Sequence, residues 1–231
     1  MQRPLLFLLL ALLVACQPRP VPQAPTTGPQ PWPAFDFQQA AAAGEPVYQL
    51  DAAASRVDIV VRRSGTLARF GHDHVIVADQ PEGWLWWPEA GAGRAEIRIW
   101  VEQLQVDPVA GRLRHALDTE PSARAVEATR SNMLNVVLES SRWPQITLTL
   151  SELSLIEGRS SALVTFTVKG VDHTERVSFD LDRSVNSLTV DGQLSLSQAE
   201  LGLAAFSALG GGLQVADTVD IHFRLVAKPT R

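Results

Sequence analysis

The chain has 231 residues and a formal net charge of −5, with 20 basic against 25 acidic side chains. Charges of both signs are interspersed along the sequence, without the basic patch or the aromatic and basic interleaving that indicates nucleic-acid binding. We therefore expect no nucleic-acid partner. Cys16 is the single cysteine, which excludes an intramolecular disulfide, so the fold must be held together by packing.

The N-terminal residues have the pattern of an export signal. Arg3 precedes an apolar run over 5–14, which is too short for a membrane span of about 20 residues but suits a signal-peptide core. The run ends in Leu13-Val14-Ala15-Cys16, which resembles the bacterial lipobox, in which the chain is cut before a cysteine that carries lipid. An ordinary secretory signal with a chance cysteine is the alternative, and the single unpaired thiol favours lipidation.

The segment that follows the cysteine indicates how the protein is held. Gln17, in place of aspartate, favours the outer membrane under the sorting rule of such lipoproteins, so we predict an exported, envelope-anchored protein that faces the periplasm. Seven prolines fall between residues 17 and 33 and favour an extended spacer. The predicted organisation is a signal peptide over 1–15, a lipidated Cys16 with a Pro-rich tether over 16–46, and one domain over 47–231.

Apolar and polar residues alternate through most of the domain. In 56–62, for example, Val57, Ile59 and Val61 share one face, and the opposite face carries the charged residues Arg56, Asp58 and Arg62, which is typical of a strand with one buried face. One-sided strands with short connections indicate an antiparallel sheet, and closure would remove its exposed edges. We predict a mainly β fold, an antiparallel barrel of about eight strands. The predicted strands are 56–62, 94–102, 145–151, 162–168, 176–182, 187–197 and 218–225, with 47–50 and 83–87 as further candidates.

One α-helix is predicted between strands, over 121–138. Pro121 suits its first turn, and Asp118, Thr119 and Ser122 are candidate caps. Four of its apolar residues share roughly one face, so the helix is expected to form a lid over one end of the barrel or a plug against its wall. These residues are Val126, Met133, Leu134 and Val137.

Six short motifs occur in the order found in a known family. The domain resembles the YceI-like family of periplasmic, lipocalin-like barrels from residue 47 to about 227. The resemblance implies an antiparallel barrel whose tunnel holds a long isoprenoid or quinone-like lipid, with no other cofactor. The matching stretches are YQLDAAASRV (48–57), LQVD (104–107), NML (132–134), VLESSRWPQI (137–146), VKGV (168–171) and VADTV (215–219).

The inward-facing positions are almost wholly aliphatic or phenylalanine, so they can line an apolar ligand tunnel. A barrel whose interior is filled by its own side chains would show the same pattern. The predicted lining residues are Ile59, Val61, Ile97, Ile99, Met133, Leu134, Leu148, Phe166, Phe179 and Phe223.

Two histidines stand where the family usually has a loop of small and aromatic residues. If 70–77 is extended, His72 and His74 project from the same face and can act as polar anchors for a ligand head group. Glu82 or Asp79 is then expected to fix the imidazole tautomer. The alternatives are a hydrogen-bonded structural pair and half of a metal site, which would need a third ligand.

The sequence contains no nucleophile elbow, zinc-protease motif or phosphate loop, so we predict a binding protein and not an enzyme. The cluster of Trp84, Trp86 and Trp87 is expected to close a barrel end, with contact to a membrane interface as the alternative. Two other functions stay open: a metal carrier or metal-dependent enzyme built on His72 and His74, and a structural or stress-response lipoprotein that binds another envelope protein.

Overall fold

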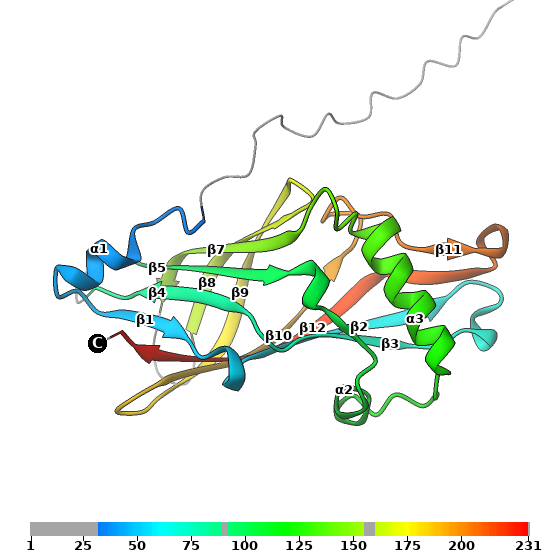
Figure 1. Ribbon diagram of the computed structural model, residues 1–231, viewed down its shortest axis with the longest axis horizontal. Helices are drawn as coiled ribbons and strands as arrows, with labels where there is room; N and C mark the ends of the chain where they lie inside the picture. The colour runs from blue at the N-terminus through cyan, green and yellow to red at the C-terminus, as the bar shows by residue number, and fades with distance from the viewer. Residues whose placement is uncertain (1–31, 89–91, 155–159, 231) are drawn as a thin grey trace, which may run out of the picture.

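The computed structural model describes residues 32–88, 92–154 and 160–230, and the export signal and Cys16 lie outside these ranges. Within them an antiparallel sheet dominates (Figure 1). Its strands are β1 (Val47–Leu50), β2 (Arg56–Ser64), β3 (His74–Ala78), β4 (Glu82–Trp86), β5 (Gly93–Trp100), β6 (Gln105–Val106), β7 (Gln145–Ser154), β8 (Ser160–Val168), β9 (Val171–Arg183), β10 (Leu188–Ser197), β11 (Ser207–Ala208) and β12 (Leu213–Pro229).

Eight of these strands close into a barrel. The order is β1-β4-β5-β7-β8-β9-β10-β12, and the ring closes where β12 pairs with β1, as in the register of Leu50 with Ala227. Every neighbouring pair in the ring is antiparallel. The predicted mainly β, antiparallel barrel of about eight strands is therefore confirmed.

The long strand β12 gives the barrel its elongated shape. Its last residues pair with β1, while 214–224 pairs with β2, which continues to β3 and β6. As a result β1 and β2 lie one after the other along the same edge of β12. Figure 1 shows the barrel stretched along this direction, with β1 near one end and α3 near the other.

Each of the seven predicted strands, and both further candidates, corresponds to a strand in the structure. The strand β3 is not among the predicted strands, although 70–77 is considered as an extended segment, because its residues after His74 are apolar on both faces. Ile76 and Ala78 belong to the main core, whereas Val75 and Val77 form a second buried cluster on the opposite face. A strand buried on both faces has no period-two pattern to reveal it.

The predicted helix is present as α3 (Ala123–Asn132), which continues as a π-helical turn over Met133–Val137. The hydroxyl of Ser122, one of the candidate caps, accepts a hydrogen bond from the Ala125 N–H at 3.3 Å. Its predicted apolar face packs against the main core through Val126, Met133, Leu134 and Val137. The helix packs against β6 near one end of the molecule (Figure 1).

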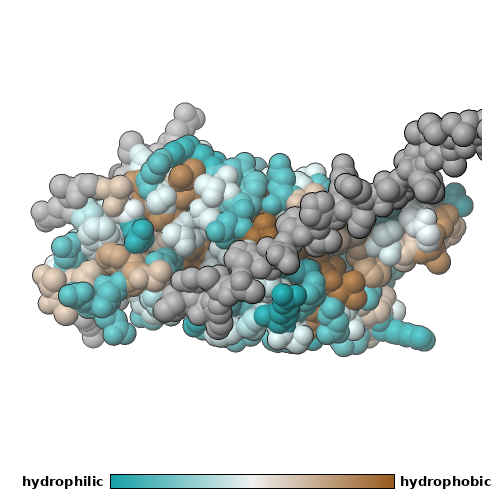
Figure 2. Space-filling model, turned by 90° about the horizontal axis from the view of Figure 1, so that it is seen from above, coloured by the Kyte–Doolittle hydropathy of each residue, from teal (hydrophilic) through white to brown (hydrophobic). Residues whose placement is uncertain are grey.

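Two short helices were not predicted, namely α1 (Phe37–Ala42) and α2 (Val109–Arg114). The helix α2 covers the outer face of β3. None of the helices in the described ranges has both the length and the hydropathy needed to cross a membrane. In the view of Figure 2 hydrophilic residues cover much of the surface, and apolar residues lie in small separate patches along the length of the molecule.

Candidate ligand tunnel and the polar network at its end

The barrel encloses a cavity of about 280 Å³. It extends from residues such as Leu85 of β4 and Leu188 of β10 to Met133 and Val137 of the π-helical turn that continues α3. Apart from Gln198, every described residue that lines it is apolar or aromatic. The Gln198 amide donates from Nε2 to the Ala216 carbonyl at 2.8 Å, so even this polar group is partly satisfied by the protein itself.

The structure brings the predicted lining residues together. Nine of the ten line the cavity, and Leu134 is instead buried in the core beside it. Their contact with a ligand stays a prediction. The nine are Ile59, Val61, Ile97, Ile99, Met133, Leu148, Phe166, Phe179 and Phe223.

The tryptophan cluster lies on the outer wall of the barrel. Trp84 and Trp86 stand opposite Glu96 and Arg94 on the polar face of β5, although Trp84 also reaches the cavity lining. They pack against the segment that precedes α1, with Trp84 5.1 Å from the ring of Trp32 between centroids. The aromatic rings therefore hold the N-terminal segment against the barrel wall instead of closing a barrel end.

A buried carboxylate completes this attachment. Glu96 is only 2% exposed, and its two oxygens accept the backbone N–H groups of Ala34 at 2.6 Å and Phe35 at 3.0 Å. The ring of Phe35 stacks on Trp86 at 5.1 Å. Part of the predicted tether, from Trp32 onward, thus packs on the barrel. The predicted domain boundary at residue 47 stays a prediction.

A second buried carboxylate lies near the opposite end of the barrel. The Asp107 side chain is fully enclosed and accepts three hydrogen bonds. The donors are Nδ1 of His74 at 2.6 Å, the Val75 N–H at 3.0 Å and Nη1 of Arg112 at 2.8 Å. Burial alone would raise the pKa of Asp107, but these donors outweigh it and hold the pKa below its ordinary value.

His74 connects this carboxylate to the helix α3. It projects from β3 to the same side as Ile76, which lines the cavity, and its Nε2 lies 3.5 Å from the Thr129 hydroxyl. The partner of the imidazole is thus Asp107, in place of the expected Glu82 or Asp79. Glu82 instead forms an ion pair with Arg98 and accepts from the Trp100 indole at 3.0 Å, while Asp79 accepts from Gln105 at 2.7 Å.

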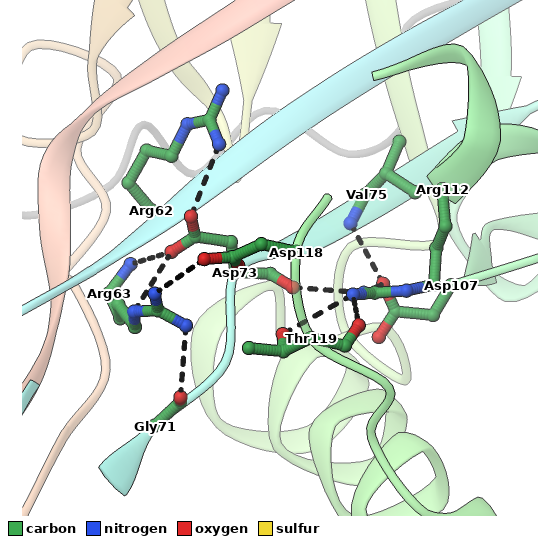
Figure 3. A network of polar contacts seen from close by, with 9 residues as sticks. All are labelled: Arg62, Arg63, Gly71, Asp73, Val75, Asp107, Arg112, Asp118 and Thr119. Carbon is green, nitrogen blue, oxygen red and sulfur yellow. Dashed lines mark hydrogen bonds and ion pairs between the residues drawn. The ribbon is translucent and has the colours of Figure 1, made fainter. Parts of the chain in front are cut away.

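The network extends from Asp107 through Arg112 (Figure 3). Arg112 also donates to the carbonyl oxygens of Asp73, at 3.0 Å, and of Thr119. The Asp73 carboxylate in turn accepts from the Arg63 N–H at 2.9 Å. The network therefore joins β2, β3, α2 and the segment that leads into α3, and it fixes how the helix approaches the barrel.

His72 takes no part in these bonds. Its ring centroid is 6.2 Å from that of His74, and its buried Nδ1 has no hydrogen-bond partner. Neither histidine is among the residues lining the cavity. Among the described residues no three His, Cys, Asp or Glu side chains gather as a metal site would require, so the anchor and metal roles gain no geometric support.

Two solved structures share this fold over most of their length. BcnA from Burkholderia cenocepacia is 17% identical with a TM-score of 0.56, and the match covers 78% of this chain and 99% of that protein. A polyisoprenoid binding domain from Saccharophagus degradans, implicated in plant cell wall breakdown, is 17% identical with a TM-score of 0.57. That match covers 79% of this chain and 98% of the domain. The expected resemblance is thus confirmed as a shared fold.

The Campylobacter jejuni YceI protein matches less closely, at 12% identity and a TM-score of 0.42, over 60% of this chain and 72% of that protein. No family model and no curated protein sequence matches the chain. The similarity to these solved proteins is therefore one of structure.

Proposed function

We propose that this protein is a binding protein that holds a long apolar molecule, of the isoprenoid or quinone-like class, inside its barrel. The observation that carries the proposal is the cavity inside the barrel, whose lining is apolar or aromatic except at Gln198. A polar ligand would lose its hydrogen bonds with water there without replacement, at a cost of about 2–7 kcal/mol per group. An apolar chain loses nothing comparable and gains from burial.

The course of the cavity favours an elongated molecule. Its lining runs along the barrel from Leu85 and Leu188 to Met133 and Val137. A chain that threads along the barrel follows this course better than a compact, multi-ring ligand does. The volume of about 280 Å³ is slightly below the common range for small-molecule pockets, roughly 300–1,000 Å³. Met133 at the α3 end has an unbranched, flexible side chain that can adjust to the ligand. The shared fold with a polyisoprenoid binding domain supports the same ligand class.

We further propose that the bound molecule is held and not chemically changed. The described residues around the cavity include no hydroxyl, thiol, amine, imidazole or carboxylate side chain. The hydrogen-bonded pair of His74 and Asp107, a combination that catalytic sites also use, is occupied by the network that fixes α2 and α3. Sequestration or transport of the lipid is therefore the activity that best suits the site.

The proposal includes export and anchoring through Cys16, which lies outside the described residues. The apolar run over 5–14 and the following Leu13-Val14-Ala15-Cys16 support it. A lipid anchor would keep the barrel near the bilayer from which an apolar ligand comes. The Cys16→Ser variant should lose incorporation of radiolabelled palmitate and leave the membrane fraction, whereas labelling of the variant at the wild-type level would refute the anchor.

The ligand itself can be identified by extraction. Protein released from the envelope without detergent is extracted with organic solvent, and the extract is examined by mass spectrometry. We expect an isoprenoid or quinone-like lipid close to one per protein. If no lipid is recovered, and the protein takes up none when it is mixed with isoprenoid-loaded vesicles, the proposal is wrong.

A further inference from the structure

The barrel wall has a seam between β9 and β10. Their pairing covers only 180–183 with 188–191, although both strands continue well beyond it. Over the rest of its length β9 pairs with β8, and β10 pairs with β12. Among the described residues no register joins 171–179 to 192–197, so backbone hydrogen bonds do not close the wall there.

An open pocket lies on the outside of the barrel at this seam, with a volume of about 550 Å³. Unlike the tunnel, it is lined mainly by polar side chains, because the outward faces of three strands meet there. They are Ser178 and Asp180 of β9, Asp191 and Gln193 of β10, and His222 and Arg224 of β12, joined by Arg56 of β2.

Two residues, Phe179 and Phe223, line both the tunnel and the outer pocket. The ring of Phe223 lies against the backbone of Gly192 in β10. A Cβ atom built on Gly192 would lie only 2.4 Å from Cζ of Phe223. The ring thus occupies the space that a side chain at this position of β10 would need. The apolar tunnel and the polar pocket are therefore separated at this point by phenylalanine side chains and not by paired backbone.

The charges of the pocket indicate what kind of group it can receive. Two guanidinium groups and two carboxylates line it, so it has no net charge when His222 is neutral. Arg224 is paired with Asp191 through two hydrogen bonds, of 3.1 and 2.8 Å. Ser178 and Gln193 add a hydroxyl and an amide, which donate and accept hydrogen bonds without charge. This balance suits an uncharged polar group better than a phosphate.

We propose that the outer pocket is the head-group subsite of the tunnel. An uncharged head that bears hydroxyl or carbonyl oxygens occupies the pocket, and its apolar chain passes between Phe179 and Phe223 into the barrel. This inference rests on the proposed function, because it requires an apolar chain in the tunnel. It adds the place and the chemistry of the head group, and a side entrance through the seam.

Three probes with the same chain and different heads test the assignment: decane, decanol and decyl phosphate. Their affinities are compared through displacement of the uncharged dye N-phenylnaphthylamine from lipid-free protein. Decanol should bind more tightly than decane by about threefold to tenfold, since one hydrogen bond contributes roughly 0.5–1.5 kcal/mol. Decyl phosphate should bind more weakly than decanol, because the pocket offers no net positive charge.

Two substitutions in the pocket then locate the head. Ser178→Ala and Gln193→Leu should remove the preference for decanol and leave the affinity for decane unchanged. The matched control is Ser195→Ala on the same face of β10, where the hydroxyl bonds Asp220 at 2.7 Å and lies outside the pocket. This control should keep the preference for decanol intact.

The results separate this inference from the proposed function. Equal affinities for decane and decanol, or a preference for decanol that survives Ser178→Ala and Gln193→Leu, would refute the subsite while the tunnel remains valid. Tightest binding of decyl phosphate would refute the uncharged head. If none of the three probes displaces the dye, the tunnel assignment itself fails, and the subsite fails with it.

Discussion

Nδ1 of His74 lies 2.6 Å from Oδ2 of Asp107, at the point where β3 and the chain after β6 meet beneath α2 and α3. The carboxylate is completely enclosed, and Arg112 bonds its other oxygen at 2.8 Å. Asp107 also has a positive φ of 52°, so the backbone turns sharply at this residue. One carboxylate thus anchors a strand and a helix, and through His74 it reaches Thr129 on α3.

Replacing this carboxylate should destabilise the fold markedly. In Asp107→Asn the largely buried guanidinium of Arg112 loses its charge partner, and removal of one member of a buried ion pair typically costs about 3–5 kcal/mol. Urea unfolding followed by circular dichroism measures the change. The control is Asp118→Asn in the same network, where an exposed carboxylate pairs with Arg63 at 3.3 Å and should contribute less than about 1 kcal/mol. Equal losses in the two variants would contradict this account.

The same carboxylate predicts how stability depends on pH. The pKa of Asp107 is lower in the folded protein than the ordinary value of 3.8, so the unfolded chain binds the proton more readily. The resulting stabilisation is complete above the ordinary pKa and is lost as the pH falls through the folded pKa. The free energy of unfolding should therefore fall from about pH 5 downward, and less steeply in Asp107→Asn. Identical slopes for the variant and the wild type would exclude the assigned role of Asp107.

Glu96 should control the attachment of the N-terminal segment to the barrel. In Glu96→Gln the charged acceptor of the Ala34 and Phe35 N–H groups is lost, and hydrogen bonds to charged groups contribute about 1.5–3 kcal/mol each. Amide hydrogen exchange at these two residues should accelerate by tenfold or more. In the control Glu45→Gln, an exposed carboxylate that bonds the Trp86 indole at 2.7 Å is altered, and exchange at Ala34 should change little. Unchanged exchange in Glu96→Gln would mean that the aromatic contacts suffice.

Much of the fold could be predicted from the sequence, because most strands of the barrel bury a single face. The apolar face of Val57, Ile59 and Val61, opposite a face with three charged residues, locates β2 and identifies which side chains line the cavity. The same reasoning missed β3, where Val75 and Val77 are buried under α2 while Ile76 faces the tunnel. Burial of both faces depends on a helix distant in sequence, which no local pattern reveals.

The polar features of the site were less accessible to sequence reasoning. Asp107 ends one of the motifs that indicate the family, but its partnership with His74 joins residues 33 positions apart in the chain. The seam between β9 and β10 could likewise not be predicted from the alternation of apolar and polar residues. That alternation shows which face of a strand is buried, but not which neighbouring strand is hydrogen-bonded to it. The only local sign is Gly192 in the middle of a strand, where a glycine often marks a close approach of another group.

The central claim is that an apolar chain occupies the tunnel, and blocking the tunnel tests it most directly. Leu148 lines the cavity, whereas its neighbour Thr149 is exposed on the outer face of β7. Binding of farnesol to lipid-free protein is measured by calorimetry for the wild type, Leu148→Trp and the control Thr149→Trp, after circular dichroism has shown that each is folded. We predict at least tenfold weaker binding in Leu148→Trp and wild-type binding in the control. Wild-type affinity in a folded Leu148→Trp protein would contradict the account.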